Sequence, residues 1–286
     1  MQQTSKNKIV SIIVLYNINL EDSSTYITLK AAIAALPSSR SIDIVVYDNS
    51  VVSHIQISNL PTDITYIHDA ENGGISKAYN IALDLARLRG CDWLLLLDQD
   101  SELSLDFIHN CWSDLQLQQD NPSIAAIVPT VYCDSTLISP CRVGWGGKVY
   151  PILVNSMRVP PYEITAINSG ALVNVAFLND IGGFNNEFWL DMLDHWLFRS
   201  IHNNRMAVIV GNNTLFHNLS IHNYSTISFA RYQNIISAES HFNASNCSVV
   251  QRVAFKIRLV IRVLKFIFIH KRADLSWLTF CYIHKR

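Results

Sequence analysis

Short apolar runs alternate with segments of helical periodicity along the first part of the chain, and this alternation limits the possible folds. Ile9–Leu15 is apolar apart from Ser11 and rich in β-branched residues, which is typical of a strand buried in a parallel sheet. Segments 25–36 and 75–89 repeat apolar residues at helical spacing. Further strands are predicted at 42–47, 65–68 and 92–97. Strands that alternate with helices predict an α/β fold, with a mostly parallel central sheet and helices on both faces.

The second half of the chain is less regular, with strands predicted at 124–131, 171–175 and 207–210 and a helix at 193–202. At 286 residues, with 49% hydrophobic and 10% aromatic side chains, the chain is long and apolar enough for one large domain with a substantial core. The same composition excludes a disordered or fibrous protein. The six cysteines form no C-x-x-C pair and no signal peptide is visible, so we expect reduced thiols and a cytoplasmic location.

Charge is unevenly divided between the body of the chain and its C-terminal end. Residues 250–286 hold nine of the 22 Lys and Arg and a single acid, so this tail carries about +8 and residues 1–249 carry about −9. The change of sign predicts a main domain over 1–249 and a basic tail over 250–286. Because the body is acidic, nucleic acid is not expected as a partner.

Segment 253–270 of the tail mixes apolar residues with four cations, which are Lys256, Arg258, Arg262 and Lys265. So many charges disfavour a membrane-spanning helix and favour a basic amphipathic helix that lies on the membrane surface. Each cation near an anionic leaflet contributes about 1 kcal/mol to binding. The alternative is a helix packed on the main domain, with its charges solvated.

Polar residues follow three of the predicted strands at the point where each strand ends. They are Tyr16 with Asn17, Asp48 with Asn49, and Asp98-Gln99-Asp100. In parallel sheets, ligands bind at the carboxyl ends of the strands, so these residues predict a site. Two acids one residue apart, directly after a strand, could bind Mg²⁺ or Mn²⁺ through one carboxylate and a sugar hydroxyl through the other. The alternative is a loop with two solvated acids.

Asn72-Gly73-Gly74 precedes the predicted helix that contains Asn80. Glycines before a helix N-terminus allow the backbone to approach a phosphate, although an ordinary helix start capped by Asn72 would look the same. The segment matches neither G-x-G-x-x-G nor the Walker A pattern, so a dinucleotide fold or a phosphate-loop ATPase is not expected.

Two acids, Asp191 and Asp194, lie between Trp189 and Trp196. A carboxylate beside aromatic rings is partly desolvated, which would raise its pKa and suit it to accept a proton. The alternative for either acid is a cap at a helix start. His217 follows a predicted strand and could bind a metal or a phosphate, or could be an ordinary loop residue.

An ordered set of short motifs resembles the family 2 inverting glycosyltransferases, whose architecture is the GT-A fold. The motifs are VLYN, YDNS, NGGISKAYN, LLLDQDS, NSGALV, GGF, WLDMLDHW and HNLS, and together they span about residues 8–240. Within the family, LLLDQDS and NGGIS are most similar to the bacterial rhamnosyltransferases that build O-antigen and related surface polysaccharides.

The resemblance implies roles for individual residues. Those that would bind the nucleotide sugar are Tyr16, Asn17, Asp48, Asn72, Gly74, Asn80, Asp98 and Gln99. Of these, the first three would hold the base and ribose, the next three would shape the pocket, and Asp98 would approach the ribose or sugar. Asp100 would bind the metal that bridges the diphosphate, and His217 would contact the metal or the diphosphate. Asp194 would be the base that deprotonates the acceptor hydroxyl.

The sequence departs from the family pattern after this base. Family members often carry a second acid two residues later, just before Trp, whereas here His195 and Trp196 follow Asp194 directly. The shortening leaves Asp191 as the alternative base, and Asp194 is preferred because it lies just before the helical segment Trp196–Arg199, as the base of the family does.

The resemblance thus implies a metal-assisted single displacement, in which rhamnose passes from dTDP-rhamnose to a lipid-linked saccharide and the basic tail contacts the membrane. A UDP-hexose donor is an alternative. A sugar nucleotidyltransferase would carry a Gly-rich, Arg- and Lys-bearing loop after the first strand, which Tyr16–Asp22 does not offer. A membrane-associated scaffold would lack the metal acid or the base, yet Asp100 and Asp194 are both present.

Overall fold

The first four long strands form a parallel sheet, as the alternating pattern predicts. In the computed structural model, which describes residues 8–36, 42–55, 60–118, 121–154, 159–217 and 224–284, they lie in the order β3-β2-β1-β4. Their bounds are β1 Ile9–Leu15, β2 Asp43–Asp48, β3 Ile64–His68 and β4 Trp93–Asp98. The side chain of His217 lies outside the described residues, so its predicted contact with metal or diphosphate stays a prediction.

Beyond β4 the sheet becomes mixed. The strand β11 (Leu172–Asn174) is antiparallel to both β4 and β6 (Ile124–Cys133), and β6 is parallel to β12 (Ala207–His217). The edge strands are β5 (Ser101–Glu102), which pairs with β12, and β7 (Thr136–Ser139), which pairs with β6. A small antiparallel sheet lies beside the main one and consists of β10 (Ile164–Thr165), β8 (Cys141–Val143) and β9 (Val149–Pro151).

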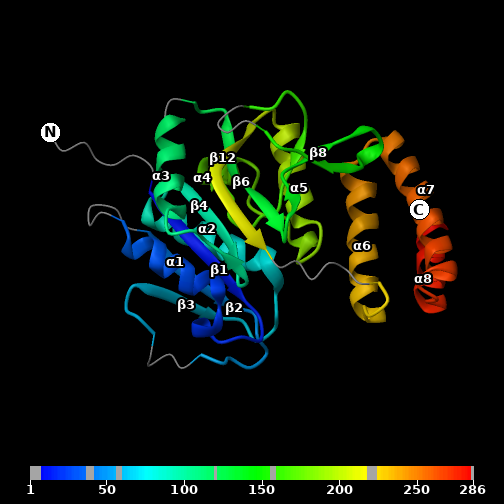
Figure 1. Cartoon of the computed structure of the whole chain (residues 1–286), viewed down its shortest axis with the longest axis horizontal. Helices are drawn as coiled ribbons and strands as arrows, with labels where there is room; N and C mark the ends of the chain where they lie inside the picture. The colour runs from blue at the N-terminus through cyan, green and yellow to red at the C-terminus, as the bar shows by residue number, and fades with distance from the viewer. Residues whose placement is uncertain are drawn as a thin grey trace.

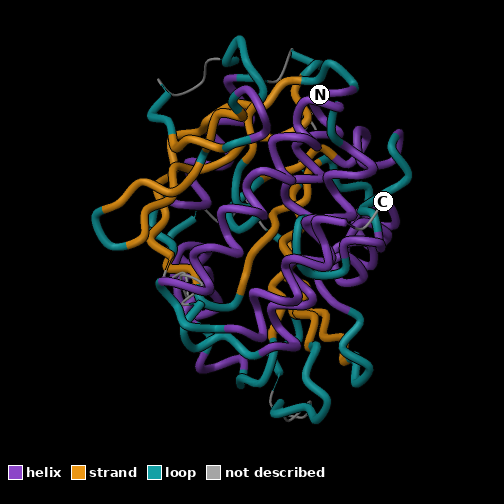
Figure 2. The backbone as a smooth tube through the Cα atoms, turned by 90° about the vertical axis from the view of Figure 1, so that its right-hand side faces the viewer, coloured by secondary structure: helices purple, strands orange, loops and turns teal. Residues whose placement is uncertain are grey.

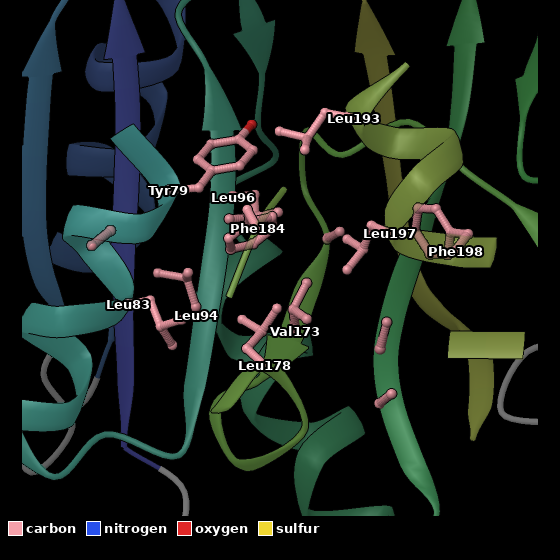
Figure 3. Packing of buried hydrophobic residues seen from close by; sticks show 14 of the residues in the cluster. Tyr79, Leu83, Leu94, Leu96, Val173, Leu178, Phe184, Leu193, Leu197 and Phe198 are labelled. Carbon is pink, nitrogen blue, oxygen red and sulfur yellow. The ribbon is translucent and has the colours of Figure 1, made fainter. Parts of the chain in front are cut away.

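Helices cover both faces of the main sheet, which confirms the predicted α/β architecture (Figure 1). Successive residues of β1 point to opposite faces: Val10 and Ile12 pack with α2 (Gly74–Arg89), and Ile9 and Ile13 pack with α1. The face of α2 also carries α4 (Val175–Asp180) and α5 (Leu193–Asn203), and the other carries α1 (Ser24–Ala34) and α3 (Phe107–Leu117). Figure 3 shows the first of these layers, with Tyr79 and Leu83 of α2 packed toward Leu94 and Leu96 of β4.

Three helices at the C-terminal end form a separate layer beside the small sheet (Figure 1). They are α6 (Phe229–Asn246), α7 (Val249–Phe268) and α8 (Ala273–His284), and their shared cluster includes Tyr232, Leu259, Phe266 and Leu275. Figure 2, which views the molecule from this side, shows helices in front of the sheet. The predicted tail is therefore helical, and α6, which precedes the predicted boundary at 249, packs with it.

Membrane crossing is a separate question from surface contact. Among the helices that the structure describes, none combines the length and apolarity that a bilayer crossing requires.

Candidate active site

The predicted strand ends do meet at one edge of the sheet. Leu15 pairs with Asp48, and Val14 pairs with Asp98, so the residues that follow β1, β2 and β4 lie side by side. The Tyr16 N–H donates to Gln99 Oε1 at 2.7 Å, and the Asn17 N–H donates to Ser50 Oγ at 2.8 Å. These bonds join three loops around the carboxyl edge of the sheet.

Asp48 is buried at this edge, and both of its carboxylate oxygens accept hydrogen bonds from the protein. Oδ1 accepts from the Ser50 N–H at 2.9 Å, and Oδ2 accepts from the Tyr66 hydroxyl at 2.8 Å. Burial is the main cause that raises the pKa of Tyr66 to about 12; the hydrogen bond with Ser53 acts in the opposite direction, and the Asp48 carboxylate adds to the increase. Asp48 thus fixes the loop after β2, and its predicted contact with the nucleotide remains a prediction.

Asp69 is a further acid at the carboxyl edge of the sheet, and the sequence patterns above did not single it out. It follows β3 and accepts hydrogen bonds from the Tyr47 hydroxyl at 2.6 Å, Lys77 Nζ at 2.8 Å and the Gly73 N–H at 3.0 Å. Burial raises the pKa of Asp69, but these donors outweigh burial and lower it to about 2. The rule that polar residues end the strands would have identified it, because Asp69 directly follows the predicted strand 65–68.

The Asn72-Gly73-Gly74 turn brings α2 against the segment that contains Trp189. Gly74 has φ 84°, and a Cβ there would lie 2.2 Å from the Trp189 carbonyl oxygen. The Gly74 N–H donates to Asn49 Oδ1 at 3.3 Å, and the Ser76 N–H donates to the Trp189 carbonyl at 3.3 Å. The close approach that Gly74 permits is therefore to the protein backbone, and two N–H groups of this helix start are already bonded.

Asn80 joins α2 to the Gly182-Gly183-Phe184 turn. Its Nδ2 donates to the Phe184 carbonyl at 2.8 Å and to Asn186 Oδ1 at 3.2 Å, and its Oδ1 accepts from the Phe184 N–H at 2.8 Å. The amide is fully used by these bonds, so Asn80 shapes the site by holding this turn.

The Asp98-Gln99-Asp100 turn is tied to two other segments. The Asp98 N–H donates to Ser169 Oγ at 3.0 Å, and that hydroxyl lies 2.8 Å from Ser101 Oγ. Pairing of β5 with β12 places the His217 backbone opposite Ser101, one residue from Asp100. In the part of the chain that the structure describes, no group of three or more His, Cys, Asp or Glu side chains is arranged to hold a metal.

The two candidate bases, Asp191 and Asp194, have different surroundings. Asp191 forms an ion pair with Arg231 of α6, in which Nη2 donates to Oδ1 at 2.7 Å and Nη1 donates to Oδ2. Asp194 lies in the first turn of α5, where Oδ1 accepts from the His195 N–H at 2.7 Å.

The charge of Asp194 also affects two buried side chains, Cys141 of β8 and Tyr79 of α2. Burial raises the pKa of Cys141 to about 11, with a further contribution from the charge of Asp194. Burial likewise raises the pKa of Tyr79, with contributions from Asp98 and then Asp194. The charges of Asp98 and Asp194 therefore act on the same tyrosine, whose hydroxyl is directed toward Leu193 at the start of α5 (Figure 3).

Comparisons with known proteins agree with this arrangement. Residues 12–140 match the family model described as Glycosyl transferase family 2. This segment is therefore similar to family 2 glycosyltransferases. A curated relative, the dTDP-rhamnosyl transferase RfbF of Shigella flexneri, is 25% identical over 217 residues, which cover 74% of this chain and 69% of the relative.

Two solved structures have a fold similar to that of this chain. TarS 1-349 from S. aureus superposes with a TM-score of 0.52 at 16% identity, covering 93% of this chain and 73% of that one. GalNAc-T7, solved with UDP, GalNAc and Mn²⁺, superposes with a TM-score of 0.59 at 14% identity, covering 95% of this chain and 56% of that one. The predicted GT-A fold and the resemblance to family 2 are thereby confirmed.

Proposed function

We propose that this glycosyltransferase transfers rhamnose from dTDP-rhamnose to a lipid-linked saccharide, with inversion at the anomeric carbon. The choice of sugar is supported by the curated relative, whose name specifies a dTDP-rhamnosyl transferase. The proposed chemistry is supported by the position of Tyr79, whose hydroxyl is directed toward Leu193, the residue before Asp194 (Figure 3), and whose pKa is raised by burial and then by the charges of Asp98 and Asp194. A donor sugar between these carboxylates would face a metal-binding turn on one side and a base on the other.

The nucleotide would lie over the carboxyl ends of β1 and β2. Tyr16 is the exposed aromatic side chain at this edge, and Asn17 adopts a left-handed φ of 55° beside it. We assign the base and ribose to these two residues with Asp48. Asn72, Gly74, Asn80 and Gln99 support the pocket through the backbone and side-chain bonds described above.

The residues around Asp100 fit a hard divalent cation, Mg²⁺ or Mn²⁺. Asp98 and Asp100 supply carboxylates on one turn, and the β5–β12 pairing brings His217 into the same neighbourhood. Hard cations prefer carboxylate oxygens and leave coordination sites for substrate phosphates, so a set of few protein ligands suits this function. When bound, such a cation neutralises the charge that develops on the departing nucleoside diphosphate.

Asp194 would act as the base in this reaction. Its carboxylate accepts the proton of the acceptor hydroxyl while that oxygen forms a bond to the anomeric carbon. The bond from the anomeric carbon to the diphosphate oxygen breaks in the same step, and the electron pair leaves with dTDP. Asp191 is less suited to the role because Arg231 already binds its carboxylate.

We also propose that α7 and α8 hold the enzyme on the membrane, where a lipid-linked acceptor would be found. Arg262, Arg258 and Lys256 of α7 bond to groups of the protein, whereas the sequence suggests that they form an outward basic face. Arg262 pairs with Glu239 at 2.6 Å, Arg258 donates to the Gly146 carbonyl at 2.7 Å, and Lys256 donates to the Tyr282 carbonyl at 3.1 Å.

The exposed face of α7 is instead apolar. Side chains at helical spacing form an outward row, which consists of Val253, Ile257, Val260, Leu264 and Ile267. Trp277 and Phe280 of α8 are also exposed, and their rings stack with centroids 5.9 Å apart. An apolar helix face of this kind suits shallow insertion among lipid head groups, so we attribute the membrane contact to apolar side chains first and to cations second.

Donor hydrolysis by the purified protein tests the proposed activity. We would compare dTDP-rhamnose, UDP-glucose, UDP-galactose and GDP-mannose, each with Mg²⁺, with Mn²⁺ and with EDTA. Metal-dependent release of dTDP from dTDP-rhamnose is the expected result. Turnover of a UDP-sugar in its place would keep the family and refute the rhamnosyl assignment.

A further inference from the structure

Two buried polar side chains have no hydrogen-bond partner among the residues that the structure describes. The Tyr79 hydroxyl and both amide atoms of Asn168 are unpaired, although Tyr79 is 0% exposed and Asn168 is 5% exposed. Ser76 Oγ, one turn before Tyr79 on α2, is unpaired as well. Buried polar groups are normally hydrogen-bonded, so each exception calls for a physical explanation.

Tyr79 packs with residues of β4, and Asn168 belongs to a segment whose backbone is hydrogen-bonded to β4, where the Gly170 N–H donates to the Leu96 carbonyl at 2.7 Å. The Tyr79 ring packs against Phe184 with centroids 5.1 Å apart, and Figure 3 shows its hydroxyl directed toward Leu193, the residue before Asp194. Asn168 immediately precedes Ser169, whose hydroxyl accepts from the Asp98 N–H at 3.0 Å. Tyr79 and Asn168 therefore lie at the place where the proposed donor sugar would meet the metal-binding turn and the base.

Comparable buried tyrosines away from this place are satisfied. The Tyr47 hydroxyl donates to Asp69 at 2.6 Å, and the Tyr232 hydroxyl lies 2.6 Å from Thr279 Oγ1. The fold thus pairs buried phenols elsewhere and leaves Tyr79 unpaired beside the two carboxylates. An unpaired buried donor lowers stability, and it becomes favourable when a ligand supplies the missing acceptor.

We propose that the Tyr79 hydroxyl and the Asn168 amide bind hydroxyl groups of the transferred sugar, and that they distinguish a nucleotide sugar from its nucleoside diphosphate. This inference rests on the proposed glycosyl transfer. A phenol and an amide suit sugar hydroxyls because each can donate and accept hydrogen bonds. A site with polar groups that need a partner also rejects ligands that lack the matching hydroxyl.

Binding at Tyr79 requires a local movement. The Tyr79 hydroxyl is covered in this structure, and Leu193 faces it in Figure 3. Met192, just before Leu193, has a left-handed φ of 67°, which is unfavourable for a residue with a long side chain. Displacement of this segment would admit the sugar and would carry Asp194, the proposed base, with it.

The Tyr79→Phe variant tests the proposal because it removes one oxygen and keeps the ring. The affinities of wild type and variant for dTDP and for dTDP-rhamnose would be measured by titration calorimetry with Mn²⁺. We expect unchanged dTDP affinity, about tenfold weaker dTDP-rhamnose affinity, and a melting temperature equal to or above that of the wild type. Asn168→Ala should weaken dTDP-rhamnose binding in the same selective way.

Tyr232→Phe is the matched control, since its hydroxyl is bonded to Thr279 in the C-terminal helices. It should lower the melting temperature and leave the ratio of the two affinities unchanged. If the wild type binds dTDP-rhamnose and both site variants keep the wild-type ratio, this inference is overturned while the proposed function stands. A wild type that binds neither ligand would refute the proposed function and the inference with it.

Discussion

Arg231 holds both carboxylate oxygens of Asp191, and it does so from α6, 40 residues away in the sequence. The ion pair connects the C-terminal helices to the segment that carries both candidate bases. The ion pair engages Asp191, whereas Asp194 lies in the first turn of α5, so the two acids that the sequence left as alternatives have different surroundings.

The first prediction concerns these two acids. Asp194→Asn should preserve dTDP-rhamnose binding and reduce transfer by a factor of about 10² to 10⁴, the usual contribution of a positioned base. Asp191→Asn should retain transfer and lower the melting temperature, because Arg231 loses its charged partner. Single-turnover transfer and thermal unfolding of both variants separate the two effects. Loss of transfer in Asp191→Asn with retention in Asp194→Asn would reverse the assignment.

A second prediction concerns the metal. Asp100→Ala should remove the difference in dTDP affinity between Mn²⁺ and EDTA, whereas the wild type should bind dTDP at least tenfold more tightly with Mn²⁺. Glu102→Ala provides a control at an exposed acid two residues further along the same segment. Titrations with and without metal give the comparison. An Asp100→Ala variant that keeps the wild-type response to Mn²⁺ would exclude this residue as a ligand.

The parallel part of the sheet and the meeting of three strand ends followed from local sequence patterns. β1 and β4 are short apolar runs, α2 has a helical period, and the carboxyl ends of parallel strands necessarily meet at one edge. β11 was expected as a strand, but its antiparallel pairing with β4 and β6 was not, because three residues contain no signal of direction. The small sheet of β8, β9 and β10 was missed for a related reason, since such short strands show no readable alternation.

Side-chain partners distant in the sequence were not predictable in this way. The composition of 250–286 gives the charge of the tail, but the inward direction of Arg258 and Arg262 depends on Gly146 and Glu239. The unpaired state of Tyr79 likewise depends on residues from α2, β4 and α5 meeting in space. The hydrophobic pattern of a segment predicts the secondary structure of that segment, but it does not predict which distant residues its side chains will contact.

A third prediction distinguishes apolar from electrostatic attachment of the C-terminal helices. Wild type should bind vesicles of anionic lipid, and 0.5 M NaCl should weaken this binding only slightly, because salt screens charges and not apolar burial. A double variant, Ile257→Asp with Leu264→Asp, should lose vesicle binding, whereas Lys265→Gln should retain most of it. Flotation assays and light scattering measure binding and oligomeric state. Full release of the wild type from vesicles by salt would contradict apolar attachment. A shift from dimer to monomer in the double variant would show that the apolar row of α7 is a protein interface and not a membrane contact.

A fourth prediction follows from the lowered pKa of Asp69. Because the pKa is about 2 in the folded protein and about 3.9 in an unfolded chain, the ionised form stabilises the fold above about pH 4. This stabilisation should be lost as the pH falls from about 4 toward 2. Asp69→Asn should be less stable than wild type at pH 6 and should lose less stability over that acid range, as measured by urea unfolding. Asp84→Asn, which affects an exposed pair with Arg87, is the control and should follow the wild-type profile. Parallel profiles for Asp69→Asn and wild type would show that Asp69 does not carry this dependence.

The last prediction concerns the contact between Gly74 and Trp189, which sets the distance from α2 to the segment that carries the base. Gly74→Ala would place a Cβ 2.2 Å from the Trp189 carbonyl oxygen, at a φ of 84°. Gly90→Ala is a matched control, because Gly90 also has a positive φ, 62°, but a Cβ there meets nothing within 4 Å. We expect Gly90→Ala to cost about 1–2 kcal/mol from backbone conformation alone, and Gly74→Ala to cost about 1–3 kcal/mol more from the clash. Transfer should fall in Gly74→Ala only, since displacement of Trp189 shifts Asp194 relative to Asp98. Equal losses of stability in urea unfolding, with transfer intact in both variants, would mean that the Trp189 segment moves freely and that Gly74 does not position the base.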